Sequence, residues 1–337
     1  MLHLPPLPVF LSSSSFFLLP SSFKNMAILT VLGAGAWGSA VATLASNNGH
    51  QVNLWSRSSS LNLDSILIET DVIVSAVSMK GVVETVERIK GINLNTNAII
   101  ITATKGLDPV TTRTPSRIWH DAFPERSIVV LSGPNLSQEI VQGLPTATVA
   151  ASIDLAAAKQ VQDIFSSDIF RVYINSDPLG TELGGTLKNV FAIAAGVCDG
   201  LHLGTNAKSA LLTRALPEMI RVGVRLGAQV ETFYGLSGLG DLLATCNSAL
   251  SRNYRVGYGL AQGKSLEQVL EELQSTAEGV NTTNVLIDLA KKQGIEVPVS
   301  TQVYRLINGI ITPEQAVAAL MERTVKPETN VPSNLNS

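Results

Sequence analysis

The sequence predicts an α/β domain with a doubly wound parallel sheet, followed by a mostly α-helical C-terminal domain. Between residues 27 and 174, short apolar runs alternate with segments of helical character. Continuous apolar strands between helices are typical of a parallel sheet that is covered on both faces. After Asp177 strand-like runs almost disappear, and long helical patterns follow one another to about residue 321.

The expected strands are short apolar runs rich in β-branched residues. They cover residues 27–33, 50–57, 71–78, 98–104 and 127–133, with later candidates at 146–152 and 170–175. The expected helices cover residues 36–49, 181–198, 210–227, 265–273, 281–294 and 312–321. We therefore expect a first domain at 26–176 and a helical domain at 177–325.

The composition fits a globular protein with a small-molecule partner. The chain has 337 residues, which is long enough for two domains, and 45% of them are hydrophobic. The formal net charge is -3, so the chain lacks the dense positive charge that binding to a nucleic-acid backbone requires. We therefore expect no nucleic-acid partner, whereas a small anionic substrate needs only a few local cations.

The two cysteines and four histidines bear on disulfides and metals. A chain of this size needs no disulfide staple, so we expect Cys198 and Cys246 to be reduced thiols in a cytoplasmic protein. The Cys and His residues do not have metal-ligand spacing, and we expect no metal site. His120 and His202 are expected to be surface or core residues.

The two ends of the chain differ in character from the rest. Residues 1–25 are rich in Pro, Ser and Phe, but they lack the basic start and the cleavage site of a signal sequence. Prolines and serines also oppose stable membrane insertion of this segment. We expect Met26 to be the true start, with residues 1–25 a translation artefact or a disordered extension; a transit peptide is the alternative. Residues 326–337 are polar and are expected to form a disordered tail.

The first strand ends in a Gly-x-Gly-x-x-Gly motif that also opens a helix, formed by Gly33, Gly35 and Gly38. In a Rossmann-like fold the first Gly permits the tight turn, the second lets a pyrophosphate approach, and the third allows close packing. The helix N-terminus, with Ala36 and Trp37, would then face the pyrophosphate. The motif predicts a dinucleotide cofactor, NAD(P)H.

The end of the second expected strand bears on the choice between the two dinucleotides. An acidic residue there favours NAD, but this chain has Ser56, Arg57 and Ser58, and no carboxylate before Asp64. Arg57 could bind a 2′-phosphate, so we expect NADP to be preferred or shared. A solvated surface arginine is the alternative.

Several polar segments follow strand ends, where ligands bind in open α/β sheets. Lys105 follows one expected strand, and Gly133, Pro134 and Asn135 follow the next one. Lys105 is suited to bind an anion or a hydroxyl group, although a solvated loop lysine is the alternative.

The helical domain contributes further candidates. Gly184 and Lys188 lie one turn apart on one helix face, and glycines inside a helix suggest that a substrate or another helix approaches closely. Burial can lower the pKa of a lysine enough for acid–base work, which favours Lys188 as a proton donor. Asp241 follows a glycine-rich stretch, where it could be only a helix cap.

A second polar cluster in this domain, Ser251, Arg252 and Asn253, is suited to phosphate, because a guanidinium binds phosphate through two hydrogen bonds. The chain thus offers a cationic phosphate site as well as two candidate lysines. These features predict a small phosphorylated substrate.

Taken in order, the motifs GAGAWG, AVSMKG, ATKGL, SGPN, GLPTA, GGTLKNV, GLGDLLATC, SRN and AEGVNTT resemble the bacterial type of NAD(P)-dependent glycerol-3-phosphate dehydrogenases. The resemblance covers residues 26 to about 323. It implies reduction of dihydroxyacetone phosphate to sn-glycerol 3-phosphate, supply of this product for phospholipid synthesis, and a possible homodimer. It also implies that Lys188 is the catalytic proton donor and acceptor.

The resemblance assigns further residues to two groups. Substrate contacts would be Lys105, Gly133, Asn135, Lys188, Asp241, Thr245, Ser251, Arg252 and Asn253. Cofactor contacts would be Gly33, Gly35, Ala36, Trp37, Gly38, Arg57, Lys105, Ser137, Arg252 and Glu278. The chain departs from the family pattern in a shortened segment between Arg57 and Asp71, at Asn135 and Ser137, and in its N-terminal extension.

Two other functions stay open at the level of sequence. A 3-hydroxyacid dehydrogenase would share the sheet domain and the helical lysine, but it would bind a carboxylate. A non-catalytic dinucleotide sensor would keep the fold without needing Lys105, Lys188 or Arg252, which argues against it.

Overall fold

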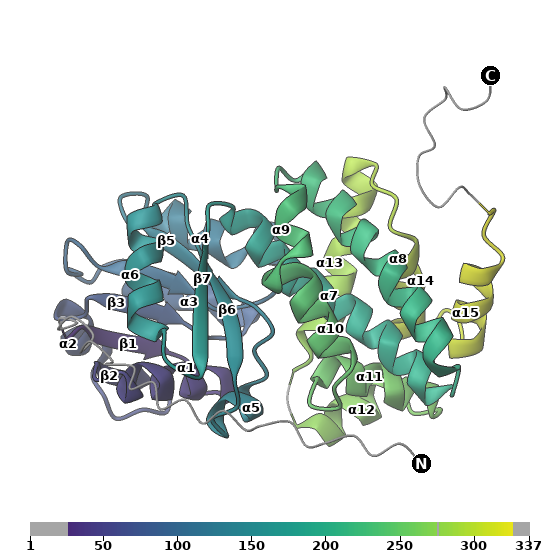
Figure 1. Ribbon diagram of the computed structural model, residues 1–337, viewed down its shortest axis with the longest axis horizontal. Coiled ribbons are helices and arrows are strands. Elements are labelled where there is room, and N and C mark those ends of the chain that lie inside the picture. The colour runs from purple at the N-terminus through teal and green to yellow at the C-terminus, as the bar shows by residue number, and fades with distance from the viewer. Residues whose placement is uncertain (1–25, 275, 326–337) are drawn as a thin grey trace, which may run out of the picture.

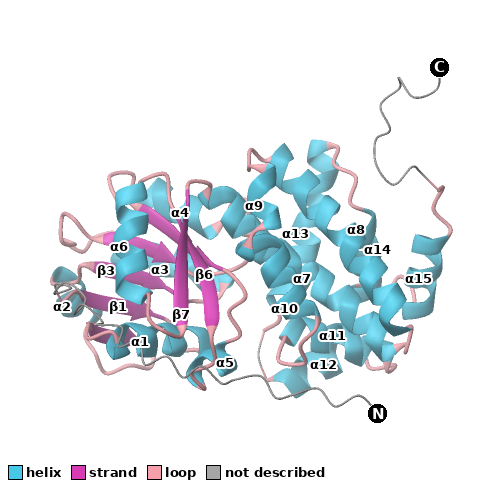
Figure 2. Cartoon of the chain, in the orientation of Figure 1, coloured by secondary structure: helices cyan, strands magenta, loops and turns pink. Residues whose placement is uncertain are grey.

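The computed structural model describes residues 26–274 and 276–325, so the expected extension at 1–25 and tail at 326–337 lie outside the described residues. Figure 1 shows a sheet-containing part on the left and a helical part on the right. Figure 2 shows that the strands are confined to the first part, as the sequence predicts.

Within the described residues, seven strands form one sheet in the order β2-β1-β3-β4-β5-β6-β7. Their bounds are β1 Ile28–Leu32, β2 Gln51–Trp55, β3 Val72–Ser75, β4 Ile99–Thr102, β5 Ile128–Ser132, β6 Thr146–Ala151 and β7 Phe170–Asn175. The chain runs from β1 outward to β2 and then crosses to β3 on the other side of β1. The carboxyl ends of β1 and β3 therefore flank a topological switch point, which is where open α/β sheets bind ligands.

The expectation of a parallel sheet needs one correction, because β6 runs antiparallel to β5. A parallel return requires a long crossover, usually through a helix that spans the sheet. The connection here contains only the short helix α5 (Ser137–Val141), so the chain turns back beside β5. β7 then follows the longer helix α6 (Leu155–Phe165) and is parallel to β6.

Helices cover both faces of this sheet. On one face, α1 (Ala36–Asn47), α5 and α6 pack over a cluster that includes Val41, Ile140 and Val161. On the other face, α2 (Leu63–Ile68), α3 (Met79–Ile89) and α4 (Pro115–Ala122) enclose Trp119. This two-sided cover explains why the central strands β3 and β4 are mostly apolar and are buried along their whole length.

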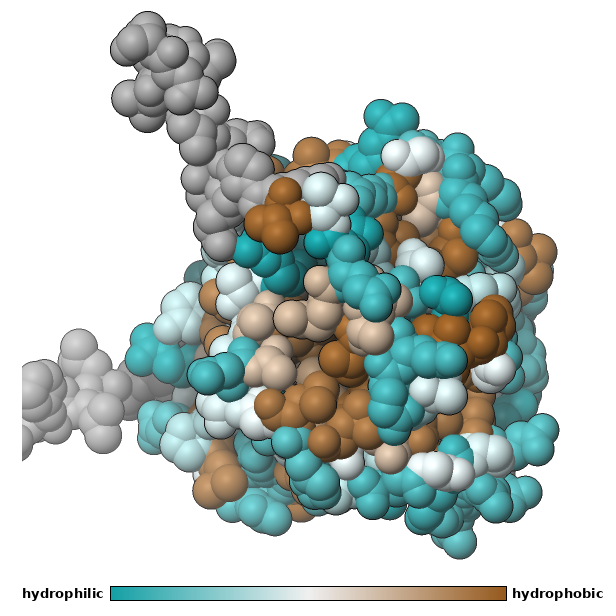
Figure 3. All heavy atoms as spheres, turned by 90° about the vertical axis from the view of Figure 1, so that its right-hand side faces the viewer, coloured by the Kyte–Doolittle hydropathy of each residue, from teal (hydrophilic) through white to brown (hydrophobic). Residues whose placement is uncertain are grey.

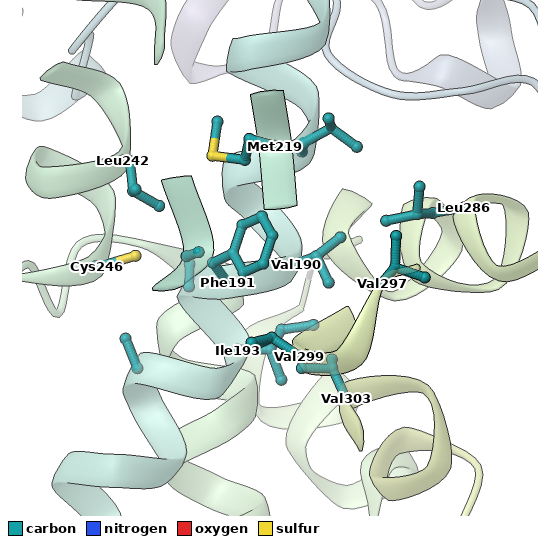
Figure 4. Close-up of a cluster of buried hydrophobic side chains, with 14 of the residues drawn as sticks. Val190, Phe191, Ile193, Met219, Leu242, Cys246, Leu286, Val297, Val299 and Val303 are labelled. Carbon is teal, nitrogen blue, oxygen red and sulfur yellow. The ribbon is translucent and has the colours of Figure 1, made fainter. Parts of the chain in front are cut away.

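Helix α7 (Pro178–Gly200) lies at the centre of the helical domain, and nearly all of its residues are buried. Figure 4 shows Val190, Phe191 and Ile193 of α7 among side chains from the surrounding helices. Those helices are α8 Gly204–Arg225, α9 Val230–Tyr234, α10 Asp241–Cys246, α11 Arg252–Ala261, α12 Leu266–Leu273, α13 Glu278–Gln293, α14 Pro298–Ile307 and α15 Pro313–Met321, with a π-helix, η1, at Leu236–Gly240.

The outer face of the helical domain mixes hydrophobic and hydrophilic side chains (Figure 3). Across the described ranges, no helix is both long and apolar enough to cross a membrane. Cys198 and Cys246 are buried and unbridged. In the same part of the chain, no group of three or more His, Cys, Asp or Glu side chains could hold a metal ion.

Candidate active site

The glycine motif forms the turn between β1 and α1. Gly33 has a φ of 113°, and a Cβ atom there would lie 2.7 Å from the carbonyl oxygen of Ala76. A Cβ atom on Gly38 would lie 1.9 Å from the carbonyl oxygen of Gly33, so helix and strand pack too closely for a side chain. At Gly35, in contrast, the space within 4 Å is open. The backbone thus leaves room for a pyrophosphate at the N-terminus of α1.

A cleft of about 810 Å³ begins at this turn and extends to the helical domain. It is lined by the predicted residues Gly33, Gly35, Ala36, Trp37, Arg57, Lys105, Asn135, Ser137, Lys188, Thr245, Ser251, Arg252, Asn253 and Glu278. Residues that the sequence placed on eight separate segments therefore meet around one space. Gly38, Gly133 and Asp241 are absent from the lining, since they lie behind it.

At the inner end of the cleft, one carboxylate holds two lysines. The Nζ atoms of Lys105 and Lys188 each lie 2.6 Å from a different carboxylate oxygen of Asp241. Lys188 also donates to the hydroxyl of Thr245, which in turn donates to Asp241 over 3.1 Å. We call Lys105, Asp241 and Lys188 the lysine triangle.

Burial tunes the ionisation of the triangle. Burial lowers the pKa of Lys188 to about 8, and the charge of Lys105 acts in the same direction, while Asp241 opposes both. The pKa of Asp241 is lowered, because the two ammonium groups outweigh its own burial. A buried lysine whose pKa lies near neutral pH can both give and take a proton.

Asp241 is held in place by a glycine-containing stretch that forms a π-helix. It is the first residue of α10, directly after η1, and the cap of α10 is Gly240 rather than Asp241. The alternative that Asp241 merely caps a helix is therefore wrong, because its carboxylate carries both lysines. A Cβ atom on Gly238 would lie 2.1 Å from the carbonyl oxygen of Phe233, which explains the glycine there.

The paired glycines of α7 bring the helix close to two other elements. A Cβ atom on Gly184 would lie 2.5 Å from the carbonyl oxygen of Ser237 in η1. On Gly185 it would lie 2.2 Å from Oγ of Ser132 and 3.3 Å from Cε of Lys105. Of the two reasons considered for Gly184, close approach of another helix is the one observed.

We expect Gly184→Ala to lower the free energy of unfolding by about 1–3 kcal/mol, because the added methyl group meets backbone that cannot move aside. Chemical denaturation measures this change. Gly91→Ala is the matched control, since nothing lies within 4 Å of a Cβ atom there. Equal losses in the two variants would contradict the packing argument.

The polar cluster at the start of α11 has divided roles. The hydroxyl of Ser251 caps α11 by accepting from the backbone N–H of Tyr254, 3.2 Å away. The side-chain carbonyl of Asn253 accepts from the backbone N–H of Gly279 over 2.9 Å. Asn253 therefore lines the cleft and also fixes the start of α13. Its role is thus broader than that of a phosphate ligand alone.

Glu278, the first residue of α13, reaches back to the sheet domain. Its carboxylate accepts from the backbone N–H of Met79 at the start of α3 over 3.3 Å. Burial raises its pKa, while the Met79 hydrogen bond and Arg252 oppose the shift. The two domains thus meet across the cleft at this residue.

Asn135 contributes mainly to the wall of the cleft, and Gly133 is buried behind that wall. The amide of Asn135 donates to the carbonyl of Ala147 and accepts from the hydroxyl of Thr148, so β6 occupies both of its ends. A Cβ atom on Gly133 would lie 2.9 Å from the Cα of Thr148. The carbonyl of Gly133 accepts a hydrogen bond from Nζ of Lys105 over 3.4 Å.

The rim near Arg57 contains two charged residues, Glu84 and Arg88, that were not predicted from the sequence. Arg57 pairs with Glu84 of α3 at 3.6 Å, and the two side chains are 79% and 63% exposed. Arg88, one turn further along α3, stacks on the ring of Trp55. Both α3 residues line the cleft, and their spacing of four on one helix face was a usable signal.

Asn189 is a further cleft residue that was missed. It follows Lys188 in α7 and is buried. An asparagine beside a candidate catalytic lysine was the only available signal, because its place in the wall depends on how α7 packs against α13.

Comparison with known proteins identifies the family of the chain. The family model described as the NAD-dependent glycerol-3-phosphate dehydrogenase N-terminus matches residues 28–65 and 58–158, and the corresponding C-terminus model matches residues 177–318. Relatives named glycerol-3-phosphate dehydrogenase (NAD(P)+) from Acaryochloris marina and Synechocystis are 61% and 63% identical over 300 residues each. These alignments cover 89% of this chain and 97% and 95% of the relatives.

Solved structures extend the comparison to the fold. A crystal structure of glycerol-3-phosphate dehydrogenase from Coxiella burnetii has a TM-score of 0.85 and 34% sequence identity, and the match covers 88% of this chain and 99% of that one. A glycerol-3-phosphate dehydrogenase structure from Dunaliella salina has a TM-score of 0.81 at 20% identity, covers 90% of this chain and 62% of that one, and shares the fold. From the two family models and these relatives, the chain belongs to the NAD-dependent glycerol-3-phosphate dehydrogenase family.

Proposed function

We propose that the protein catalyses the reversible NAD(P)H-dependent reduction of dihydroxyacetone phosphate to sn-glycerol 3-phosphate. The observation that carries this proposal is the lysine triangle at the inner end of a dinucleotide cleft. The names of the family members support the same reaction.

The residues around the glycine turn fit a nicotinamide dinucleotide, because Gly35 leaves open space at the N-terminus of α1. Gly33, Gly35, Ala36, Trp37, Arg57 and Glu278 would hold it. When bound, the reduced nicotinamide supplies the hydride that the C2 carbonyl carbon of the substrate accepts.

The chain itself supplies the proton and the orientation. In the reducing direction, the ammonium of Lys188 donates a proton to the oxygen that was the carbonyl, which completes the alcohol. Lys105 orients the same oxygen, and Asp241 holds both amines in line through its two carboxylate oxygens. Arg252 binds the phosphate, which anchors the substrate away from its reacting carbon.

An assay that follows the absorbance of the reduced cofactor tests the reaction. We expect oxidation of NADH or NADPH with dihydroxyacetone phosphate, and inhibition by sn-glycerol 3-phosphate but not by a 3-hydroxyacid. Turnover of a 3-oxoacid in its place would favour the hydroxyacid dehydrogenase, and dinucleotide binding without any turnover would favour the sensor.

Arg57 supports a preference for NADP or shared use of both cofactors. It lies on the rim of the cleft, and Glu84 leaves it exposed enough to meet a 2′-phosphate. We expect Arg57→Ala to raise the KM for NADPH by about 10- to 100-fold, the equivalent of one charged hydrogen-bond contact, and to change the KM for NADH by less than about threefold.

The matched control for this prediction is Arg171→Ala, which removes an exposed arginine of β7 that stacks on Tyr173 outside the cleft. We expect this control to leave both KM values unchanged. Equal effects of Arg57→Ala on the two cofactors would refute the 2′-phosphate assignment.

We also propose a domain boundary near residue 176, cytoplasmic residence, a role in supplying phospholipid synthesis, and a homodimer. The boundary is supported by the end of β7 at Asn175 and the start of α7 at Pro178. Limited proteolysis tests the domain boundary, cell fractionation the cytoplasmic location, and lipid analysis of a deletion strain the role in phospholipid synthesis. Analytical ultracentrifugation tests the homodimer, and a monomer in that experiment would overturn it.

A further inference from the structure

The segment that carries Lys105 is tied to α7 at two places. Near its start, the hydroxyl of Thr186 accepts from the backbone N–H of Gly106 over 3.0 Å. At its end, the carboxylate of Glu182 accepts from the backbone N–H of Ser116 over 2.8 Å and from the Ser116 hydroxyl. Glu182 and Thr186 lie one turn apart on α7, so one face of this helix holds both ends of the segment.

Glu182, in the helical domain, caps the N-terminus of helix α4 in the sheet domain. The first helical residues of α4 leave backbone N–H groups that need an acceptor, and its own cap residue, Thr114, makes no side-chain capping bond. The Glu182 side chain, with a residue exposure of 2%, fills that role. Burial raises the pKa of Glu182 to about 7, although hydrogen bonds from Ser116 and Thr114 oppose the shift. The α4 helix packs on β4 and β5, the strands that precede Lys105 and Gly133.

Lys188 lies six residues after Glu182 on the same helix, which is about 9 Å along its axis. A shift of α4 relative to α7 would therefore change the distance between Lys105 and the Lys188–Asp241 pair. An error of about 1 Å in such an alignment can cost about 100-fold in rate.

We propose that Glu182 is a positioning residue, which couples α4 and the Lys105 segment to the helix that carries Lys188. This inference rests on the proposed function, because it concerns the alignment of the same lysine triangle. Glu182 does not line the cleft, so its effect acts through the segment from Gly106 to Ser116 rather than through contact with the substrate.

The test compares Glu182→Ala with Glu218→Ala. Glu218 is a buried carboxylate of α8 that accepts from the backbone N–H groups of Val299 and Ser300, both at 2.9 Å, and so completes α14 within the helical domain. Both variants remove a buried helix cap, so we expect similar falls in Tm. At saturating cofactor and substrate, we expect Glu182→Ala to lower kcat by about 10- to 100-fold and Glu218→Ala to lower it by less than about threefold.

Glu182→Gln provides the rescue, since its amide can accept from the Ser116 N–H and donate to the Ser116 hydroxyl. We expect it to keep kcat within about threefold of the wild type. Ser116→Ala, which removes only the hydroxyl, keeps the test open if Glu182→Ala does not fold, and we expect an intermediate kcat. Unchanged kcat in folded Glu182→Ala and in Ser116→Ala, or equal kcat losses in Glu182→Ala and Glu218→Ala, would overturn the inference.

A readout independent of activity separates this inference from the proposed function. Amide hydrogen exchange of residues 106–116 should be faster in Glu182→Ala, or in Ser116→Ala if the first does not fold, than in the wild type, and unchanged in Glu218→Ala. A wild-type protein inactive on dihydroxyacetone phosphate would defeat the proposed function alone, whereas unchanged exchange in these variants would defeat the positioning role.

Discussion

Lys188→Ala should lower kcat for dihydroxyacetone phosphate reduction by about 10²- to 10⁴-fold, the usual contribution of a positioned proton donor. Lys188 is the buried amine of the triangle, and the remaining amine, Lys105, lies on the opposite carboxylate oxygen of Asp241. Steady-state kinetics measures the loss. Dinucleotide binding, measured by fluorescence titration, should change by less than about threefold because the glycine turn is untouched.

The pH dependence of the wild-type enzyme checks the same assignment. Because the pKa of Lys188 is lowered from 10.5 to about 8, the ammonium that donates the proton is lost as the pH rises through about 8. The reduction rate should fall across this range, whereas the oxidation rate should rise, since oxidation needs the neutral amine. Lys159→Ala, on the exposed face of α6, is the control. This variant should show the same pH dependence of the reduction and oxidation rates as the wild type. Normal turnover by Lys188→Ala would end the proposed mechanism.

Asp241→Asn should combine a large loss of activity with a large loss of stability. The substitution leaves two neighbouring amines without the carboxylate that offsets their charge, and breaking a buried ion pair costs about 3–5 kcal/mol. We expect this fall in the free energy of unfolding from urea denaturation, together with a fall in kcat of at least about 100-fold. The pH limb of any residual activity should move to lower pH, because Asp241 raises the pKa of Lys188.

A comparable pair at the surface supplies the control for Asp241. Asp199 pairs with Lys208 at 2.6 Å, but the Asp199 side chain is 30% exposed, whereas that of Asp241 is 1% exposed. We expect Asp199→Asn to cost only about 1 kcal/mol, since solvent screens partly exposed pairs. A stability loss in Asp241→Asn no greater than in Asp199→Asn would contradict the role given to the buried carboxylate.

Much of the fold could be predicted because burial on both faces leaves a clear apolar pattern in the strands. The candidates at 146–152 and 170–175 are confirmed as β6 and β7. The direction of β6 could not be predicted, because strand composition carries no sign of direction. The short helix α5, which prevents a full crossover, gave only a weak pattern of its own.

The sequence predicted the residues of the candidate site better than the hydrogen bonds between them. Lys105, Lys188 and Asp241 were each expected at the site, but one carboxylate shared by both lysines depends on the packing of η1 against α7. Glu182 gave no signal, because an acidic residue in a helix is ordinarily solvated and its partner, Ser116, lies far away in the sequence.

The lysine triangle joins two ammonium groups to one carboxylate, so it bears a single net positive charge before each reaction cycle. In the proposed reaction one proton departs with every alcohol formed, and the triangle becomes electrically neutral. The Lys105 side chain is 19% exposed and that of Lys188 is 8% exposed, so bulk water can return the proton at the Lys105 corner. The anionic product would thus leave from beside a neutral triangle, and the next anionic substrate would meet a recharged one.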